Sequence, residues 1–409
     1  MYRIDWKTAS WDAPGADKHC RIVVAADWAP IRHFGNVMLE DPVAIYGDTL
    51  DVLRAADCRI VNLECAMDDG TPIAKSGPNL KGSPKHMVCF DVPKFDAATL
   101  ANNHVMDFGA GAFEKTLALL DAHGVKHVGA GMDAAKATEP LILDVRGLKV
   151  GIVNFGEAQD GIAATDRAPG IFGWDLDLVE KRIAESKAVC DTVLVIVHAG
   201  LEFIPYPPDY VREGCRRVAA AGADAVIAHH PHVPQGAEFF DGVPIFYSLG
   251  NYVFYQAVDY YYRKIGYLVD LDLDARGKLA GFALHPYQID DRGVHLLTGE
   301  RFAEFSSLME QISAPLAEHG AEAWNAVMKE LWSRGHLRSV VAGVDRMFDE
   351  EPVHGAARMF NHFVVPCNYE YFKAVLRRYI DGTIDDAPEA YFAWAKEYND
   401  RKLPTENKK

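Results

Sequence analysis

The sequence lacks three features that would each place it in a particular class of proteins. No stretch approaches the roughly 18 consecutive apolar residues that a membrane span requires. The polar start MYRIDWKTASWDAPGADKHCR has no apolar segment of the kind that a secretion signal carries. Basic residues are also few: 42 stand against 58 acidic ones, and a formal net charge of −16 repels nucleic acid. We therefore expect neither a membrane span nor a nucleic-acid partner.

Cysteine is scarce, and its pattern suggests no pairing. The seven cysteines are scattered and form no Cys-x-x-Cys motif, so a thiolate zinc site is not expected. An odd number of cysteines without the spacing of a disulfide framework favours a reducing compartment. Together with the missing signal segment, this predicts a cytoplasmic protein.

Short apolar runs rich in valine and isoleucine recur up to about residue 285 and predict β-strands. Helical patterns lie between several of them, as in residues 110–124, where Phe113, Leu117 and Leu120 share one face. The segments DVRGLKV and FFDGVPIF carry turn residues typical of β-hairpins. These patterns predict a mixed α/β core with two packed sheets flanked by helices.

The pattern changes after about residue 300, where apolar positions recur at helical spacing and strand signals become rare. We predict three parts: an N-terminal segment over residues 1–19, an α/β domain over 20–300, and a helical C-terminal region over 301–409. The lysine-rich end DRKLPTENKK is expected to fray.

Five of the apolar runs end in a side chain able to bind a metal ion. In α/β sheets the carboxyl ends of the strands gather at one edge, where ligands bind, so these side chains are expected to meet. Imidazole nitrogens together with carboxylate and amide oxygens suit Mn, Fe or Zn. The residues are Asp27, Glu64, Asn103 with His104, His198, and the cluster of His229, His230 and His232.

Several of these residues, taken alone, also have a structural explanation. Asp27 could cap the following segment, and Glu64 could be a solvated charge at a strand end. Asn103 could be a turn residue in the left-handed conformation that asparagine often adopts. A lone histidine such as His198 is more often hydrogen-bonded than metal-bound. Their joint placement at strand ends favours the metal site.

The histidine cluster AHHPH is different, because three imidazoles beside a buried strand carry a desolvation cost that a metal or substrate role would explain. In an extended segment, His230 and His232 face the same way, with Pro231 fixing the backbone between them. His229 is then expected to face the other side.

Several long segments resemble one known family. The stretches NLE, TLANNHVMDFGAGAFEKTLALLDAHGVKHVGAGMDAAKA, VIVHAGLEF and GADAVIAHHPHVPQGAEFFDGVPIFYSLGNYVF are similar to CapA-type proteins of poly-γ-glutamate capsule synthesis. That family belongs to the calcineurin-like metallophosphoesterase superfamily. The resemblance covers roughly residues 20–300, and it implies a β-sandwich flanked by helices with metals at the strand ends. The helical C-terminal appendage lies outside it.

The resemblance also implies individual roles. His104 would serve as acid or phosphate contact, and Glu202 in HAGLE would lie in the pocket with Asp107 as a further catalytic candidate. Candidates for substrate contact are His229, Asn251 and Tyr252. One or two divalent ions are implied, Mn first and Fe, Zn or Ca as alternatives. Their ligands would be Asp27, Glu64, Asn103, His198, His230 and His232.

The first motif departs from the superfamily pattern. Superfamily phosphatases usually have Asp-x-His there, whereas this chain has Asp27, Trp28 and Ala29. One metal position therefore lacks a nitrogen ligand, and His33 could substitute or could be a surface residue. CapA-type proteins often carry a membrane anchor or export signal, and neither is visible in this sequence.

Three functions remain open from the sequence. The first is metal-dependent hydrolysis of a phosphoester or a peptide or γ-glutamyl substrate. The second is metal-dependent peptide epimerisation, in which two bases on opposite faces deprotonate and reprotonate a Cα. The third is a non-catalytic subunit that binds an anionic polymer. The expected partner is a small molecule or peptide, and a homo-oligomer stays open.

Overall fold

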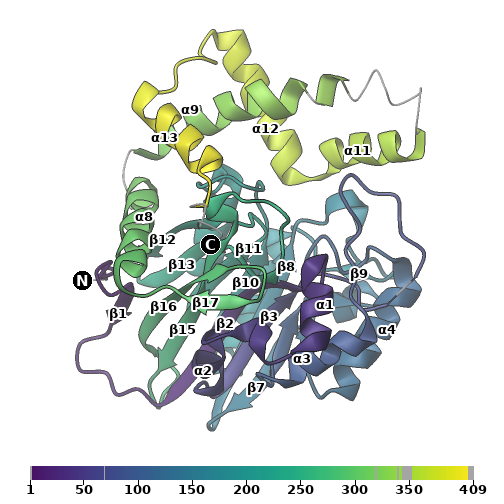
Figure 1. The fold of residues 1–409 in the computed structure, drawn as a ribbon, viewed down its shortest axis with the longest axis vertical. Coiled ribbons are helices and arrows are strands. Elements are labelled where there is room, and N and C mark those ends of the chain that lie inside the picture. The colour runs from purple at the N-terminus through teal and green to yellow at the C-terminus, as the bar shows by residue number, and fades with distance from the viewer. Residues whose placement is uncertain (1, 69, 318–319, 339, 343–351, 404–409) are drawn as a thin grey trace, which may run out of the picture.

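The computed structural model of the chain describes residues 2–68, 70–317, 320–338, 340–342 and 352–403. Two β-sheets pack face to face, and helices cover the outside of the sandwich (Figure 1). This confirms the predicted α/β class, a β-sandwich flanked by helices with a helical C-terminal region. Among the described helices, none combines the length and apolar character needed to cross a membrane.

The larger sheet has nine strands, and its central strands β2 to β5 are parallel. Strand β15 pairs with β2 in antiparallel fashion, and β16 pairs with β15 in the same way. Across the sheet the strands are β1 (Ser10–Asp12), β16 (Leu279–Ile289), β15 (Ile265–Leu273), β2 (Cys20–Ala29), β3 (Cys58–Leu63), β4 (Ala97–Thr99) and β5 (Lys126–Val128), with β14 (Asn251–Phe254) beside β2 and β17 (Val294–Leu296) beside β16.

The smaller sheet has six strands and includes both predicted hairpins, β7 with β8 and β12 with β13. Strands β8, β10, β11 and β13 run parallel. Across the sheet the strands are β12 (Pro234–Phe240), β13 (Val243–Leu249), β11 (Ala225–His229), β10 (Thr192–His198), β8 (Leu148–Gly156) and β7 (Leu141–Val145), and a separate pair is formed by β6 (Ala130–Gly131) and β9 (Gly170–Ile171).

Strand β10 shows why these segments read as continuous apolar runs. Leu194 and Ile196 pack in the core between the sheets, whereas Val193, Val195 and Val197 pack in a second core under the helices. Alternate side chains of a strand point to opposite faces, so a strand covered on both sides needs apolar residues throughout.

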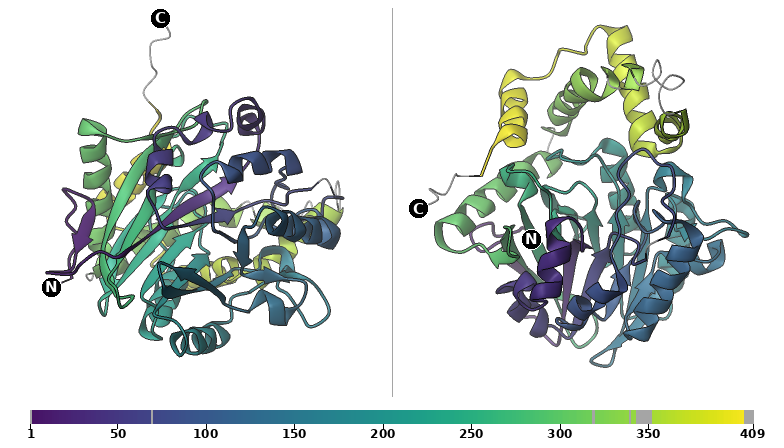
Figure 2. Two further views of the ribbon diagram at one scale, coloured as in Figure 1. Left: turned by 90° about the horizontal axis from the view of Figure 1, so that it is seen from below. Right: turned by 45° about the vertical axis from the view of Figure 1, so that its right-hand side comes forward.

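Helices α6 and α7 cover the outer face of the smaller sheet, α4 packs beside β5, and α8 packs on β12. Helices α9, α11, α12 and α13 form a layer at one end of the sandwich (Figure 2). The α-helices are α1 (His33–Glu40), α2 (Thr49–Arg54), α3 (Met87–Asp91), α4 (Gly109–Ala122), α5 (Ala134–Ala137), α6 (Leu176–Lys187), α7 (Asp209–Ala220), α8 (Gly299–Ala317), α9 (Gly320–Trp332), α11 (Pro352–Val364), α12 (Pro366–Asp381) and α13 (Glu389–Asp400).

Both ends of the chain are more integrated than the sequence predicted. Residues 10–12, expected in a separate N-terminal segment, form β1 and extend the larger sheet beside β16. At the other end, the backbone of Leu403 donates to the carbonyl of Asp259, and Lys402 pairs with Tyr260. The first part of the segment expected to fray is therefore fixed, and residues 404–409 lie outside the described residues.

Candidate metal centre

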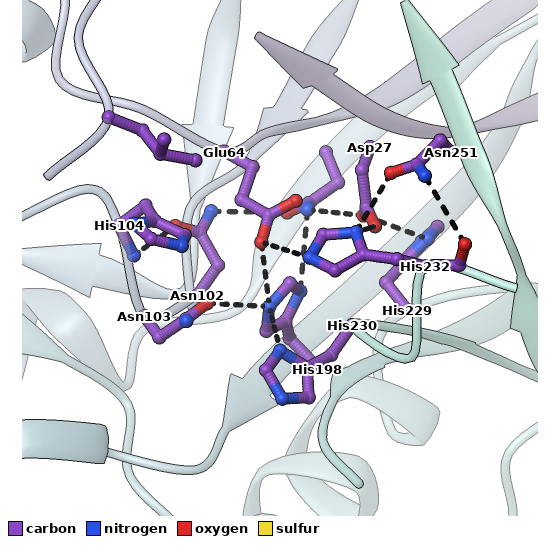
Figure 3. A network of polar contacts seen from close by, with 12 residues as sticks. Asp27, Glu64, Asn102, Asn103, His104, His198, His229, His230, His232 and Asn251 are labelled. Atoms are coloured by element: carbon purple, nitrogen blue, oxygen red, sulfur yellow. Dashed lines mark hydrogen bonds and ion pairs between the residues drawn. The ribbon is translucent and has the colours of Figure 1, made fainter. Parts of the chain in front are cut away.

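The predicted ligand residues meet at one edge of the sandwich, where strands of both sheets end (Figure 3). Three of them lie at the ends of β2, β3 and β10, and the others lie in the loops after β4 and β11. The six side chains, none more than 5 % exposed, are Asp27, Glu64, Asn103, His198, His230 and His232.

A first group of donor atoms surrounds Nε2 of His198. This nitrogen lies 3.0 Å from Oδ1 of Asn103 and 3.1 Å from Nδ1 of His230. It also lies 3.4 Å from Oε1 of Glu64. The carboxylate and the two imidazoles offer atoms within 4.8 Å of one another. Metal–ligand bonds of about 2 Å allow atoms at this spacing to share one ion.

A second group shares Glu64 with the first. Oδ2 of Asp27 lies 3.3 Å from Nδ1 of His232, and Nε2 of His232 lies 3.8 Å from Oε1 of Glu64. The donor atoms of these three residues again lie within 4.8 Å of one another. The arrangement therefore offers two adjacent positions for a cation, with one carboxylate common to both.

The second group has no nitrogen from the first motif. The methyl group of Ala29 is buried where the superfamily pattern has histidine. His33 does not replace it, because its side chain is exposed and its Nε2 contacts the carbonyl of Asp291, 2.7 Å away. Among the described residues, this group consists of two carboxylates and one imidazole.

Several acidic oxygens at this centre are buried without a hydrogen-bond donor among the described residues. Oδ2 of Asp27 and both carboxylate oxygens of Glu64 accept no hydrogen bond from the described residues. Burial raises the pKa of Glu64 well above its usual range. Buried carboxylates are costly unless they are paired or bind a metal, so these atoms fit a divalent cation.

The histidines are suited to metal as neutral ligands. Burial lowers the pKa of His198 well below its usual range, and it lowers the pKa of His230 to about 4. Both rings are therefore uncharged near neutral pH, which leaves a nitrogen lone pair for a metal ion. Burial by itself lowers the pKa of His232, but the adjacent carboxylate of Asp27 raises it, and the net shift is upward.

Asn62 is a positioning residue that the sequence analysis missed. Its Nδ2 donates to Oδ1 of Asp27 at 2.8 Å and lies 3.3 Å from Nδ1 of His198. A β-bulge between Ala25 and Asp27 changes the direction of β2 at this point. Asn62 stands two residues before Glu64 in NLE, and this i, i+2 spacing was a signal for a shared strand face.

Asn251 contacts the predicted ligand His232 and does not line the cavity, which differs from its predicted contact with substrate. Its Oδ1 lies 2.8 Å from Nδ1 of His232, and its Nδ2 donates to the His232 carbonyl. An N–H at Nδ1 leaves Nε2 free to face Glu64. Tyr252 was also predicted to contact substrate, but it is fully buried and its hydroxyl bonds to that of Thr49.

Gln159, in the short turn η3 (Gln159–Gly161), contacts two predicted ligands. Its Oε1 accepts from Nδ2 of Asn103 at 3.1 Å, and its Nε2 lies 3.1 Å from Nε2 of His230. The first contact points Oδ1 of Asn103 toward His198. No feature of the sequence around Gln159 predicted this role, because it depends on how the loop after β8 folds back.

His104 is held by a buried carboxylate and a buried ammonium. Its Nδ1 lies 2.7 Å from Oδ2 of Asp107, whose Oδ1 accepts from Nζ of Lys75 at 2.6 Å. Burial raises the pKa of Asp107 to about 6. Asp107 is fully buried and also accepts from the backbone N–H of Leu80. It therefore positions His104, and the prediction that Asp107 itself acts on a substrate is wrong.

The histidine loop does not have the extended geometry that the sequence predicted. Strand β11 ends at His229, and φ is +101° at His230 and +57° at His232. Backbone strain of this kind gathers at functional sites. His229 is in register with His198 on the neighbouring strand and lies 3.7 Å from Asp27, so it faces the centre and not the opposite side.

A cavity of about 760 Å³ lies beside the centre. Asn103, His104 and His230 line it, and Glu202, an exposed residue, lies in its wall as the resemblance implied. His229 is not among the lining residues, so its predicted contact with substrate is wrong for this cavity. The cavity therefore brings His104 and two predicted ligands to one space.

Two packed sheets flanked by helices, with carboxylates and imidazoles gathered at the strand ends, define an α/β sandwich protein with a candidate metal centre. The chain belongs to the family described as bacterial capsule synthesis protein PGA_cap, whose family model matches residues 21–256.

Curated relatives match parts of the chain. PGA biosynthesis protein CapA of Bacillus subtilis is 34 % identical over 183 residues, covering 42 % of this chain and 48 % of the relative. Capsule biosynthesis protein CapA of Bacillus anthracis is 31 % identical over 271 residues, covering 58 % and 66 %. The chain thus spans about half to two thirds of the length of these relatives.

Solved structures are more distant. The 5'-nucleotidase precursor from Thermus thermophilus is 16 % identical with a TM-score of 0.42, covering 71 % of this chain and 58 % of that chain. A hypothetical protein from the same organism is 16 % identical with a TM-score of 0.43, covering 66 % and 99 %. Likenesses of this kind say nothing about activity.

Proposed function

We propose that the chain is a metal-dependent hydrolase of a phosphoester or of a peptide or γ-glutamyl bond. The observation that carries the proposal is the carboxylate of Glu64, which belongs to two adjacent donor groups beside a cavity lined by His104. The curated relatives are named for capsule and PGA biosynthesis, so a γ-glutamyl polymer is one candidate substrate.

The donor set suits Mn first, with Fe, Zn or Ca as alternatives. Divalent ions bound there would polarise a substrate oxygen and lower the pKa of water toward neutrality. One ion would be held by Asp27, Glu64 and His232, and the other by Glu64, Asn103, His198 and His230.

We assign the remaining roles to individual residues of the chain. We assign protonation of the leaving group to His104, whose Nδ1 is engaged by Asp107 and whose ring lines the cavity. Burial and the neighbouring ammonium of Lys75 lower the pKa of His104 well below its usual range, so the ring would have to gain its proton with substrate bound. Asn62 and Asn251 fix the orientation of Asp27 and His232.

The decisive experiment measures bound manganese and hydrolysis of bis(p-nitrophenyl) phosphate and γ-glutamyl p-nitroanilide by the same preparation. We expect about two manganese ions per chain, with Glu64→Gln losing both metal and turnover. Glu213→Gln, at an exposed position of α7, is the matched control and should behave as wild type. A wild-type chain that binds no manganese would contradict the proposal, whereas metal binding without turnover would favour the polymer-binding alternative.

Peptide epimerisation is a second candidate, favoured by one observation. The cavity wall carries two groups able to exchange protons, Glu202 and His104. The missing nitrogen at Ala29 would impair two-metal hydrolysis more than proton abstraction beside a metal-bound carbonyl. The comparisons lend this candidate no support. Incubation of candidate peptides with the manganese-loaded protein in deuterated water tests it, and absence of deuterium at every Cα would rule it out.

A further inference from the structure

The cavity has a second wall that comes from the C-terminal helices. Described residues within 331–340 and 355–368 of this region line the cavity, and they lie outside the segment 21–256 that matches the family. Figure 2 shows α9, α11 and α12 placed over the end of the sandwich where the strands finish. The site is thus shared between the family fold and a part of the chain beyond it.

The chemistry of this second wall differs from that of the first. The metal side presents carboxamide and imidazole groups, through Asn103, His104 and His230. The helical side presents large apolar groups, and further apolar groups come from the loop after β10. The apolar lining residues are Leu331, Trp332, Val340, Met359, Leu201 and Phe203. The helical wall also carries polar side chains, which are Arg358, an exposed residue, His362, Asn361, Asn368 and Asn399.

The helical wall is fastened to the loops around the metal centre. Oδ1 of Asn361 accepts from the backbone N–H of Asp160 at 2.8 Å, and its Nδ2 donates to Oγ of Ser76 at 2.9 Å. Asp160 directly follows Gln159, which contacts two predicted ligands. Asn361 is only 7 % exposed, so these bonds are shielded from water. The wall is therefore a fixed part of the site.

We propose that this site takes an amphipathic ligand: a polar or anionic reacting group at the metal centre, joined to an apolar group that packs on the helical wall. The inference rests on the proposed metal-dependent function for the position of the polar group. Apolar surface removed from water strengthens binding in proportion to its area, so the wall selects among ligands with the same reacting group.

Two phosphonates that share a headgroup test the inference. Phenylphosphonate and methylphosphonate are titrated into the full chain by calorimetry, with and without Mn²⁺. We expect phenylphosphonate to bind about tenfold or more tightly than methylphosphonate. Met359→Ser and, separately, Leu331→Ser should reduce this preference about threefold or more and leave methylphosphonate binding unchanged. Met132→Ser, at an exposed position away from the cavity, is the matched control.

The outcomes separate the inference from the proposed function. Equal affinity for the two phosphonates, or binding of neither, would overturn the apolar wall as a recognition element. An equal loss of both affinities in Met359→Ser and Leu331→Ser would overturn it as well, since it would indicate a general effect on folding. A chain that does not bind Mn²⁺ but still prefers phenylphosphonate would contradict the metal-dependent function. It would leave the apolar wall supported as a recognition element.

Discussion

The carboxylate of Glu157 accepts a hydrogen bond from the backbone N–H of Cys367 at 3.0 Å, which joins the end of β8 to the first turn of α12. Its other oxygen accepts from the backbone N–H of Gly200 at 3.2 Å. The side chain is almost fully buried, and burial raises its pKa to about 7. One carboxyl group thus ties the C-terminal helices to two loops of the sandwich.

This contact predicts a pH-dependent stability. The pKa of Glu157 rises from 4.5 to about 7 on folding, so the folded chain keeps this proton to higher pH. Its contribution is therefore favourable at low pH and is lost as pH rises from about 4.5 through 7, a change on the order of 3 kcal/mol. We expect the melting temperature of wild type to fall more between pH 5.5 and 8 than that of Glu157→Gln, measured by circular dichroism.

The control for this prediction is Glu213→Gln, an exposed position that should keep the wild-type pH dependence. A Glu157→Gln chain whose melting temperature follows the wild-type curve across the same pH range would show that the shifted carboxyl is not the cause.

The buried ion pair of Lys75 and Asp107 predicts a large loss of stability when one partner is removed. Lys75→Met leaves a carboxylate without its cation in the interior, which costs about 3–5 kcal/mol near pH 8. The cost should shrink at pH 5, since the pKa of Asp107 is raised to about 6 and the carboxyl then carries a proton. Urea denaturation at both pH values measures this. Lys115→Met breaks an exposed pair with Asp68 and should change little.

The pairing of His104 with Asp107 predicts a graded loss of turnover. His104→Ala removes the proton donor and should lower kcat for bis(p-nitrophenyl) phosphate on the order of a hundredfold, with manganese content unchanged. Asp107→Asn holds the ring of His104 less firmly, so it should lower kcat by a smaller factor than His104→Ala. His123→Ala disrupts the exposed pair with Asp91 and serves as control. Unchanged turnover in His104→Ala would remove this residue from the mechanism.

The hydrogen bond that Oδ1 of Asn251 accepts from Nδ1 of His232 predicts weaker metal binding when it is lost. Partners of ligating histidines typically contribute 10- to 100-fold to metal affinity, so Asn251→Ala should weaken one manganese equivalent by about that factor. The affinity for the other manganese ion should be unchanged. Calorimetry or electron paramagnetic resonance can distinguish the two ions. Asn325→Ala, a buried asparagine in α9, is the control. Equal weakening of both equivalents would contradict the assignment.

The sequence was sufficient for the parts of the site that depend on local pattern. Apolar runs followed by Asp27, Glu64 or His198 indicate strand ends, and strand ends of α/β sheets meet. The meeting of these residues, and of His230 with His232, was therefore predictable. The geometric argument for the histidines was nevertheless wrong, because it assumed an extended backbone where φ is positive.

What the sequence did not reveal depends on contacts between distant segments. Asn361 bonds to Ser76, 285 positions earlier in the chain, and nothing near either residue indicates the other. Lys75 and Gln159 lie in loops without a repeating pattern, so their contacts with Asp107 and Asn103 follow only from the folded chain. The helical wall was not predictable for the same reason. The periodicity of the sequence predicts its helices, but it does not predict that they lie over the cavity.

The division of the cavity between two parts of the chain has a consequence for biosynthesis. Residues 27–232, which carry every predicted ligand, are synthesised well before the helical wall, whose described residues begin at Leu331. Domains generally fold as they emerge, N-terminal parts first. A nascent chain can therefore assemble the metal-binding edge while the cavity is still open on one side, and selectivity for the ligand is acquired last.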